Sequence, residues 1–310
     1  MFFLSPKDVS VSLDIGSHSV KLVKIERGKK VKVLNAVKIL LPQDLIRGSF
    51  VNENIREQKV FTEKIKELFL NSGLNDKETV IGIPDTSARS IFLELENVPG
   101  NKEDAKELII WKLKKDIDSN LDKNFAIDYQ ILNKEIKEKK SFYQLFVVLI
   151  NKKILAEYEE SLKQAGLKPV LTALSSFGLV NFFNFFGKSS GNFLIVNLGY
   201  QVTTLLIIKD QKLDFIRSIE NFNSIKSAQG DFAREISVSL RYYENKTGGA
   251  PIEKIFLTGG PASFKDIDVF FKSAFHLDTF RINQVERINL VRNIAMDDIL
   301  TYASAIGLLI

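Results

Sequence analysis

The chain contains no cysteine and only two histidines among its 310 residues. Disulfide frameworks, thiolate zinc sites and cysteine nucleophiles are therefore excluded, and so is a histidine-rich metal site. Any chemistry must use carboxylates, lysines, hydroxyl groups and the backbone.

Long apolar runs and concentrated charge are missing as well. The most apolar window, residues 142–150, is much shorter than the ~20 residues of a membrane-spanning helix and fits a buried strand. The net charge of +5 is the balance of 43 basic and 38 acidic residues that are mixed along the chain. Without a basic stripe that carries stacking aromatics, nucleic acid is not an expected partner.

What is present is enough apolar material for a large folded interior. Apolar residues make up 45% of the chain and include 24 phenylalanines. Because a chain of this length exceeds the usual size of one domain, two lobes with separate cores are expected.

The most informative segment is a strand, turn and strand at residues 11–25. The first strand delivers Asp14 to its end, Gly16 permits a tight turn with exposed N–H groups, and Ser17 and Ser19 add hydroxyl donors. Such a turn suits phosphate groups, with Asp14 holding Mg²⁺ through water. On its own, the segment fits an ordinary hairpin equally well.

A second copy of this pattern begins the other half of the chain, at residues 193–208. Asn197 and Gly199 correspond to Asp14 and Gly16, and the hydroxyls of Thr203 and Thr204 correspond to those of the first turn. Two matching hairpins that face one cleft predict a nucleotide held between the lobes.

Three further features complete the pattern. Residues 87–169 predict a strand, a helix, two strands and a helix, which form an inserted α+β unit. A later strand, 255–258, runs into Gly259 and Gly260, and an alanine-rich helix at 297–309 ends the chain.

Together these features resemble the actin-like ATPase superfamily over nearly the whole chain. The chain looks most like the PilM branch of this superfamily, which is related to FtsA. The features that carry this likeness are the sequence of residues 14–23, the inserted unit and the helix around Trp111. The resemblance implies an α/β, actin-like (ribonuclease H-like, duplicated) fold of two lobes. It divides the chain into the first lobe (1–86), the inserted subdomain (87–169), a return helix and linker (170–190), the second lobe (191–296) and a C-terminal helix that packs on the first lobe (297–310).

The resemblance also implies a function in partner recognition and no catalysis. Proteins of this branch are cytoplasmic scaffolds of the type IV pilus assembly platform, peripheral at the inner membrane, and act between a PilN-like membrane protein and the motor ATPase. The N-terminal cytoplasmic tail of PilN docks beside the inserted unit. For that groove we expect apolar walls from Ile91, Leu93, Leu108 and Trp111.

ATP and Mg²⁺ occupy the central cleft in this superfamily. The residues that match its phosphate motifs are Asp14, Gly16, Ser17, His18, Ser19, Lys21, Gly199, Gln201, Thr203 and Thr204. Gly259, Gly260 and Pro261 match its adenosine motif, and Asp14 is the metal candidate.

Two departures argue against tightly enclosed nucleotide. Asn197 stands where the family usually has an aspartate, so it brings no charge for Mg²⁺. In addition, only residues 219–228 remain where the family has a subdomain over the base and ribose, which leaves that side of the cleft open to water.

Three alternatives remain open at this point. One is an FtsA-like polymer-forming protein, and another is a GspL-like secretion protein. The third is an actin-superfamily kinase of small molecules, which needs a positioned carboxylate base. Asp85 is the one candidate for that base, although an aspartate beside Pro84 is typical of a turn.

Overall fold

The computed structural model describes residues 8–118, 120–138, 140–186, 191–220, 229–248, 251–282, 288–290 and 299–310. The linker before residue 191, most of the shortened segment 219–228 and the first residues of the predicted C-terminal helix lie outside these ranges. None of the described helices combines the length and apolar character that crossing a bilayer requires.

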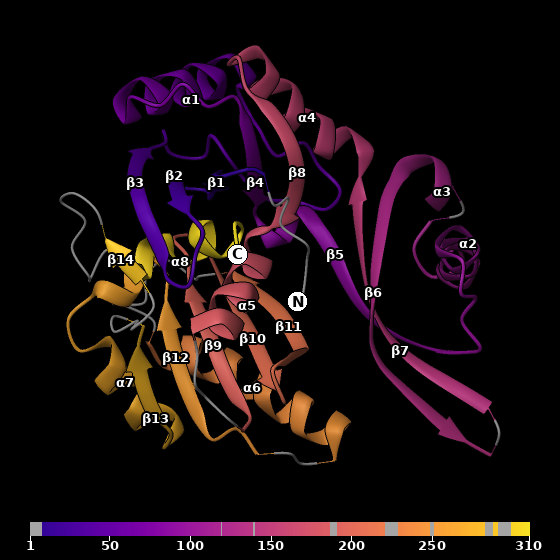
Figure 1. Cartoon of the computed structure of the whole chain (residues 1–310). Coiled ribbons are helices and arrows are strands. Elements are labelled where there is room, and N and C mark those ends of the chain that lie inside the picture. Colours follow the sequence, from indigo (N-terminus) through magenta and orange to yellow (C-terminus); the bar gives the residue numbers. More distant parts are fainter. Residues whose placement is uncertain are drawn as a thin grey trace.

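The first lobe is built on a six-stranded sheet in the order β14-β3-β2-β1-β4-β8 (Figure 1). Three strands form an antiparallel meander, and three more add in parallel. Their bounds are β1 Val11–Ile15, β2 Ser19–Glu26, β3 Val31–Leu40, β4 Glu78–Ile83, β8 Lys168–Leu174 and β14 Ile288–Leu290. Helices α1 (Gln58–Ser72) and α4 (Lys152–Gln164) cover the outer face.

The second lobe repeats this plan in a five-stranded sheet, β11-β10-β9-β12-β13. Again an antiparallel meander is extended by a strand parallel to its first member. The strands are β9 Phe193–Leu198, β10 Val202–Lys209, β11 Lys212–Glu220, β12 Lys254–Thr258 and β13 Asp278–Arg281. Helices α6 (Gln229–Thr247) and α7 (Ile267–Phe275) pack on its outer face.

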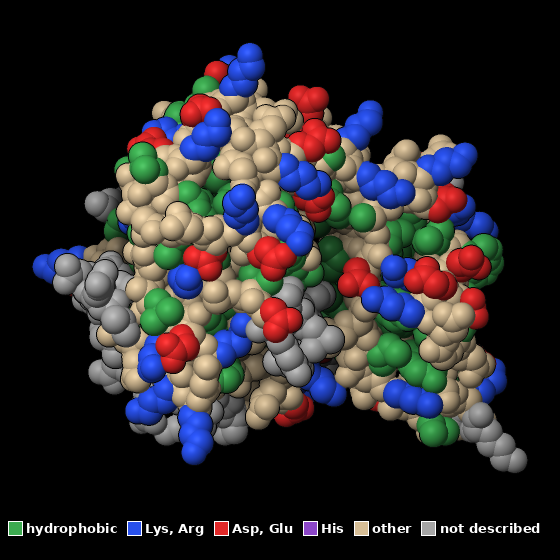
Figure 2. Space-filling view, turned by 45° about the horizontal axis from the view of Figure 1, so that its top comes forward, with side chains coloured by type: hydrophobic (Ala, Val, Ile, Leu, Met, Phe, Trp, Pro, Cys, Tyr) green, Lys and Arg blue, Asp and Glu red, His purple; other side chains and the backbone are tan. Residues whose placement is uncertain are grey.

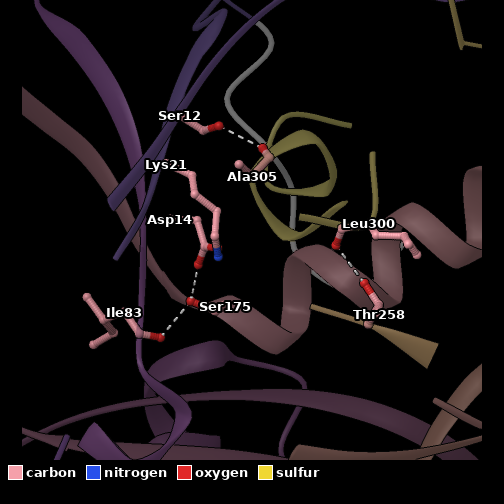
Figure 3. Close-up of polar contacts among 8 residues, drawn as sticks. All are labelled: Ser12, Asp14, Lys21, Ile83, Ser175, Thr258, Leu300 and Ala305. Carbon is pink, nitrogen blue, oxygen red and sulfur yellow. Dashed lines mark hydrogen bonds and ion pairs between the residues drawn. The ribbon is translucent and has the colours of Figure 1, made fainter. Parts of the chain in front are cut away.

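Helices α5 (Ser175–Phe186) and α8 (Ile299–Gly307) lie between the two sheets (Figure 1). They cross closely at two glycines, since a Cβ on Gly307 would stand 1.7 Å from the carbonyl oxygen of Gly178. The side chain of Asn181 donates to the Gly307 carbonyl at 3.2 Å, and Ser12 of β1 donates to the Ala305 carbonyl at 2.6 Å (Figure 3). The small residues of α8 therefore permit this contact with the first lobe.

The inserted unit extends to one side of the body (Figure 1). Its sheet, β5-β7-β6, consists of β5 Ala88–Glu96, β7 Lys140–Asn151 and β6 Phe125–Lys137. Helices α2 (Lys102–Leu113) and α3 (Leu121–Asn124) cover one face. The other face contacts the body, where the rings of Phe146 and Phe177 of α5 meet edge to face at 5.6 Å.

Two predicted boundaries are wrong. Helix α4 and the start of β8 fall inside the range 87–169 that was assigned to the inserted unit, yet both pack in the first lobe. Strand β14 falls inside the range 191–296 that was assigned to the second lobe, yet it pairs in parallel with Val31–Leu40 of the first sheet. The physical reason is that the outer edge of β3 is otherwise free in the described part of the chain, and the returning segment covers it.

Candidate functional site

A cleft of about 350 Å³ lies between the lobes, where the two hairpin turns meet the start of α5 and the side of α8. Almost all residues predicted from the two phosphate motifs and the adenosine motif line it. They are Asp14, Gly16, Ser17, His18, Ser19, Lys21, Gly199, Gln201, Thr204, Gly259, Gly260 and Pro261.

Thr203 is the exception, and its prediction as a cleft residue is wrong. Successive side chains of a strand point to opposite faces of the sheet. Thr204 of β10 points to the cleft, so Thr203 points to the other face, where it is fully buried.

The two turns have the same construction. The N–H of Gly16 donates to the Ser19 carbonyl at 3.0 Å, and the N–H of Gly199 donates to the Val202 carbonyl at 3.1 Å. A Cβ on Gly199 would lie 2.3 Å from that carbonyl oxygen, so the second turn requires glycine. The sequence duplication thus corresponds to a structural one.

Aromatic rings join the two turns. His18 of the first turn stacks on Tyr200 of the second, with ring centroids 4.1 Å apart and planes inclined by 11°. Beside them, the side-chain amide of Gln201 donates to Asp44 at 3.3 Å. His18 and Gln201, predicted from the sequence as phosphate ligands, thus each contact the opposite lobe, which their motifs do not indicate.

Asp14 is nearly buried at the end of β1, and both of its carboxylate oxygens have partners (Figure 3). Lys21, its cross-strand neighbour on β2, places Nζ 2.7 Å from Oδ2. The hydroxyl of Ser175, at the start of α5, lies 2.6 Å from Oδ1 and 3.1 Å from the Ile83 carbonyl. An ammonium group thus occupies the position where a cation would bind Asp14.

The donor set does not fit a directly bound Mg²⁺. Hard divalent cations take several oxygen ligands, with carboxylates prominent among them. Asn197 supplies only a neutral amide, and the described residues contain no group of three or more acidic, histidine or cysteine side chains suited to a metal. The surroundings of Asp14 therefore do not favour direct coordination of Mg²⁺, and the expectation that Asp14 holds Mg²⁺ through water stays a prediction.

Asp85 closes the floor of the cleft at the start of the short 3₁₀ helix η1 (Asp85–Ser87), directly after β4. The N–H of Ser176 donates to Oδ1 at 3.1 Å, and the Thr204 hydroxyl of the other lobe donates to Oδ2 at 2.8 Å. Burial of the carboxyl raises the pKa of Asp85, and the nearby charge of Asp14 adds to the rise. Asp14 lies in the part of β1 next to the turn and Asp85 follows the adjacent parallel strand β4, so the two carboxylates come to the same edge of the sheet.

Gly259 follows β12 and has a positive φ of 90°. A Cβ there would lie 2.2 Å from the Leu198 carbonyl oxygen, and its N–H donates to the Leu300 carbonyl of α8 at 3.1 Å. Glycine is thus required by packing alone. Gly260 has no atom within 4 Å of a Cβ position, so it leaves the cleft open at this point.

All four residues predicted to line the partner groove lie in the inserted unit. Ile91 and Leu93 of β5 and Leu108 of α2 pack against the core between the inserted sheet and its helices. All three are partly buried because α2 covers their face of the sheet, and their role in a partner groove stays a prediction. Of the four groove candidates, Trp111 has an exposed side chain, at 69% of its full accessible surface.

Duplicated sheets with the same strand plan, facing hairpin turns and an interlobe cleft define an actin-like two-lobe fold, as predicted. The chain belongs to the family described as type IV pilus assembly protein PilM, whose model matches residues 12–223.

Solved structures agree with this assignment of the fold. A structure titled "PilM-PilN type IV pilus biogenesis complex" superposes with a TM-score of 0.84 at 18% identity, and the match covers 98% of each chain. The ethanolamine utilization protein EutJ from Carboxydothermus hydrogenoformans superposes with a TM-score of 0.54 at 9% identity, over 97% of this chain and 88% of EutJ. Among curated proteins, none matched the sequence.

Proposed function

We propose that this protein is a scaffold of the type IV pilus assembly platform that binds the N-terminal cytoplasmic tail of a PilN-like inner-membrane protein. One observation carries the proposal: along 98% of its length, the chain superposes on the structure of a PilM–PilN type IV pilus biogenesis complex. The tail then recruits the protein to the cytoplasmic face of the inner membrane, where it acts between the membrane proteins and the motor ATPase.

The docking site that we propose lies between the inserted unit and the body. Figure 2 shows a recess there with hydrophobic side chains at its floor. Strand β5 is an edge strand of the inserted sheet, with β7 as its neighbour on one side. An exposed strand edge offers unpaired backbone groups, so an extended peptide gains main-chain hydrogen bonds by adding to it.

Photo-crosslinking tests this placement. A synthetic tail peptide with a photoreactive residue is irradiated with the full chain, and the attached peptide is located by mass spectrometry. We expect attachment to residues 88–96. Attachment confined to other elements would refute the docking site while leaving the partner itself in place.

Trp111 gives a second test, because it is the single tryptophan of the chain. Exposed tryptophans are enriched among residues that dominate binding energies, with losses of ~2 kcal/mol or more on truncation. We expect Trp111→Ala to weaken peptide binding at least tenfold. Tyr242→Ala, which removes a 56% exposed aromatic from α6, is the matched control. Equal peptide affinities of the two variants would refute the proposal that Trp111 contacts the bound peptide.

The cleft contacts support a role without catalysis. The carboxylates that line it are Asp14 and Asp85, and every oxygen of the two has a protein partner. A substrate hydroxyl would have to compete with these protein donors for the carboxylate oxygens. A coupled assay that scans small metabolites as phosphate acceptors tests this, and turnover that depends on Asp85 would overturn the proposal.

A further inference from the structure

We propose that a latch of this chain's own side chains closes the mouth of the cleft, in addition to the apolar core that the two lobes share, and that the cleft closes without a metal–nucleotide complex. The latch consists of three interlobe contacts: His18 with Tyr200, Asp44 with Gln201, and Asp85 with Thr204. This inference does not depend on the identity of the partner.

The aromatic contact closes the cleft at the two turns. Parallel rings at a centroid distance of 4.1 Å are in direct contact, so no ligand atom fits between them. The rings belong to the turns whose N–H groups were expected to hold phosphate, and they connect one lobe to the other at that point. The latch thus takes the place that a bridging phosphate would have.

The two polar contacts extend the latch away from the turns. Their first-lobe members come from separate segments, since Asp44 follows β3 and Asp85 follows β4. Their second-lobe members, Gln201 and Thr204, lie close to Tyr200 in one continuous segment. One short stretch of the second lobe therefore contacts three separate segments of the first.

Charge in the cleft also favours closure without metal. Lys21 neutralises Asp14 within the first lobe, and Asp85 is engaged by Ser176 and Thr204. A Mg²⁺ ion would have to displace the Lys21 ammonium or break the contact between Asp85 and the second lobe. In both cases binding of Mg²⁺ would break an ion pair or hydrogen bond that already satisfies one of these carboxylates, which costs free energy.

Hydrogen–deuterium exchange of the full chain tests the latch directly. We expect the amides of residues 14–21 and 197–204 to be protected without nucleotide, and 1 mM ATP with Mg²⁺ to change their exchange less than twofold. We expect His18→Ala to speed exchange in residues 197–204 of the opposite lobe by about three- to tenfold, because a stacked aromatic pair is worth ~0.5–1.5 kcal/mol.

Control variants separate the latch from general destabilisation. Tyr242→Ala removes another exposed aromatic of the second lobe and should leave exchange in both turns unchanged. Tyr200→Phe keeps the aromatic ring, so exchange in both turns should match that of the unaltered chain. This variant keeps the proposal testable if an alanine variant folds poorly. Adding Tyr200→Ala to His18→Ala should add little, since both remove the same contact.

Two results would overturn the proposal. One is a more than twofold change in the exchange of the two turns on addition of ATP and Mg²⁺, if EDTA abolishes that change. The other is unchanged exchange of residues 197–204 in His18→Ala.

Discussion

Glu157 of α4 holds the loop that follows β3, and its removal gives the sharpest stability prediction. Its Oε2 accepts the backbone N–H groups of Asn54 at 2.8 Å and Ile55 at 3.0 Å, both in buried positions. The same loop carries Asp44, which contacts the second lobe, and Phe50, whose ring stacks on Phe125 of the inserted unit at 5.2 Å. Glu157 therefore supports a loop that touches all three parts of the molecule.

The structure sets the size of the effect. Glu157→Ala leaves two buried N–H groups without an acceptor, and each such group costs ~1–3 kcal/mol. The expected loss in the free energy of unfolding is thus roughly 2–6 kcal/mol. The midpoint of thermal unfolding should therefore fall by roughly 4–24 °C, since each kcal/mol is worth ~2–4 °C.

Chemical denaturation and thermal unfolding of three variants provide the assay. Glu157→Gln keeps an acceptor oxygen and should lose much less than Glu157→Ala. Glu160→Ala, an exposed position on the same helix, should change stability by less than about 0.5 kcal/mol. If Glu157→Ala is no less stable than Glu160→Ala, the reasoning about the loop is refuted.

Three further predictions concern packing and titration. Gly307→Ala forces a Cβ against the Gly178 carbonyl and should cost ~1–3 kcal/mol or more by urea unfolding, whereas an unchanged midpoint would contradict the close crossing. Phe146→Ala should cost ~3–5 kcal/mol and speed protease cleavage in the inserted unit, while uniform cleavage along the chain would argue against its docking on Phe177. Because the pKa of Asp85 is raised by burial, its contribution to stability is present below its unfolded pKa and is lost as pH rises through the folded pKa. Relative to Asp85→Asn, the unaltered chain should therefore lose stability as pH rises above the ordinary aspartate pKa of about 4, and parallel pH profiles of the two would contradict the assignment.

The turns of the cleft were predictable because their signals are local. Gly16 and Gly199 each follow an apolar strand and precede hydroxyl residues, and both glycines lie at tight turns. The inserted sheet was also predictable, since its strands and helices follow one another along the sequence. These features need only short-range periodicity and turn chemistry.

The rest depends on contacts between residues that are distant in sequence. The hydrogen bond between Thr204 and Asp85 joins residues that are 119 positions apart in the sequence. Strand β14 pairs with β3, which is likewise distant from it in the sequence. The burial of Leu108 depends on which face of the inserted sheet α2 covers, which the helix sequence does not specify. The stacking of His18 on Tyr200 likewise depends on the position of one lobe relative to the other.

Calorimetric titration with the N-terminal cytoplasmic peptide of a PilN-like protein tests the central claim most directly. With the full chain in EDTA and without nucleotide, we predict saturable binding of one peptide per chain, and no binding of a scrambled peptide of the same composition. Absence of saturable heat with the native peptide, both in EDTA and with ATP and Mg²⁺, would contradict the proposed role in pilus assembly.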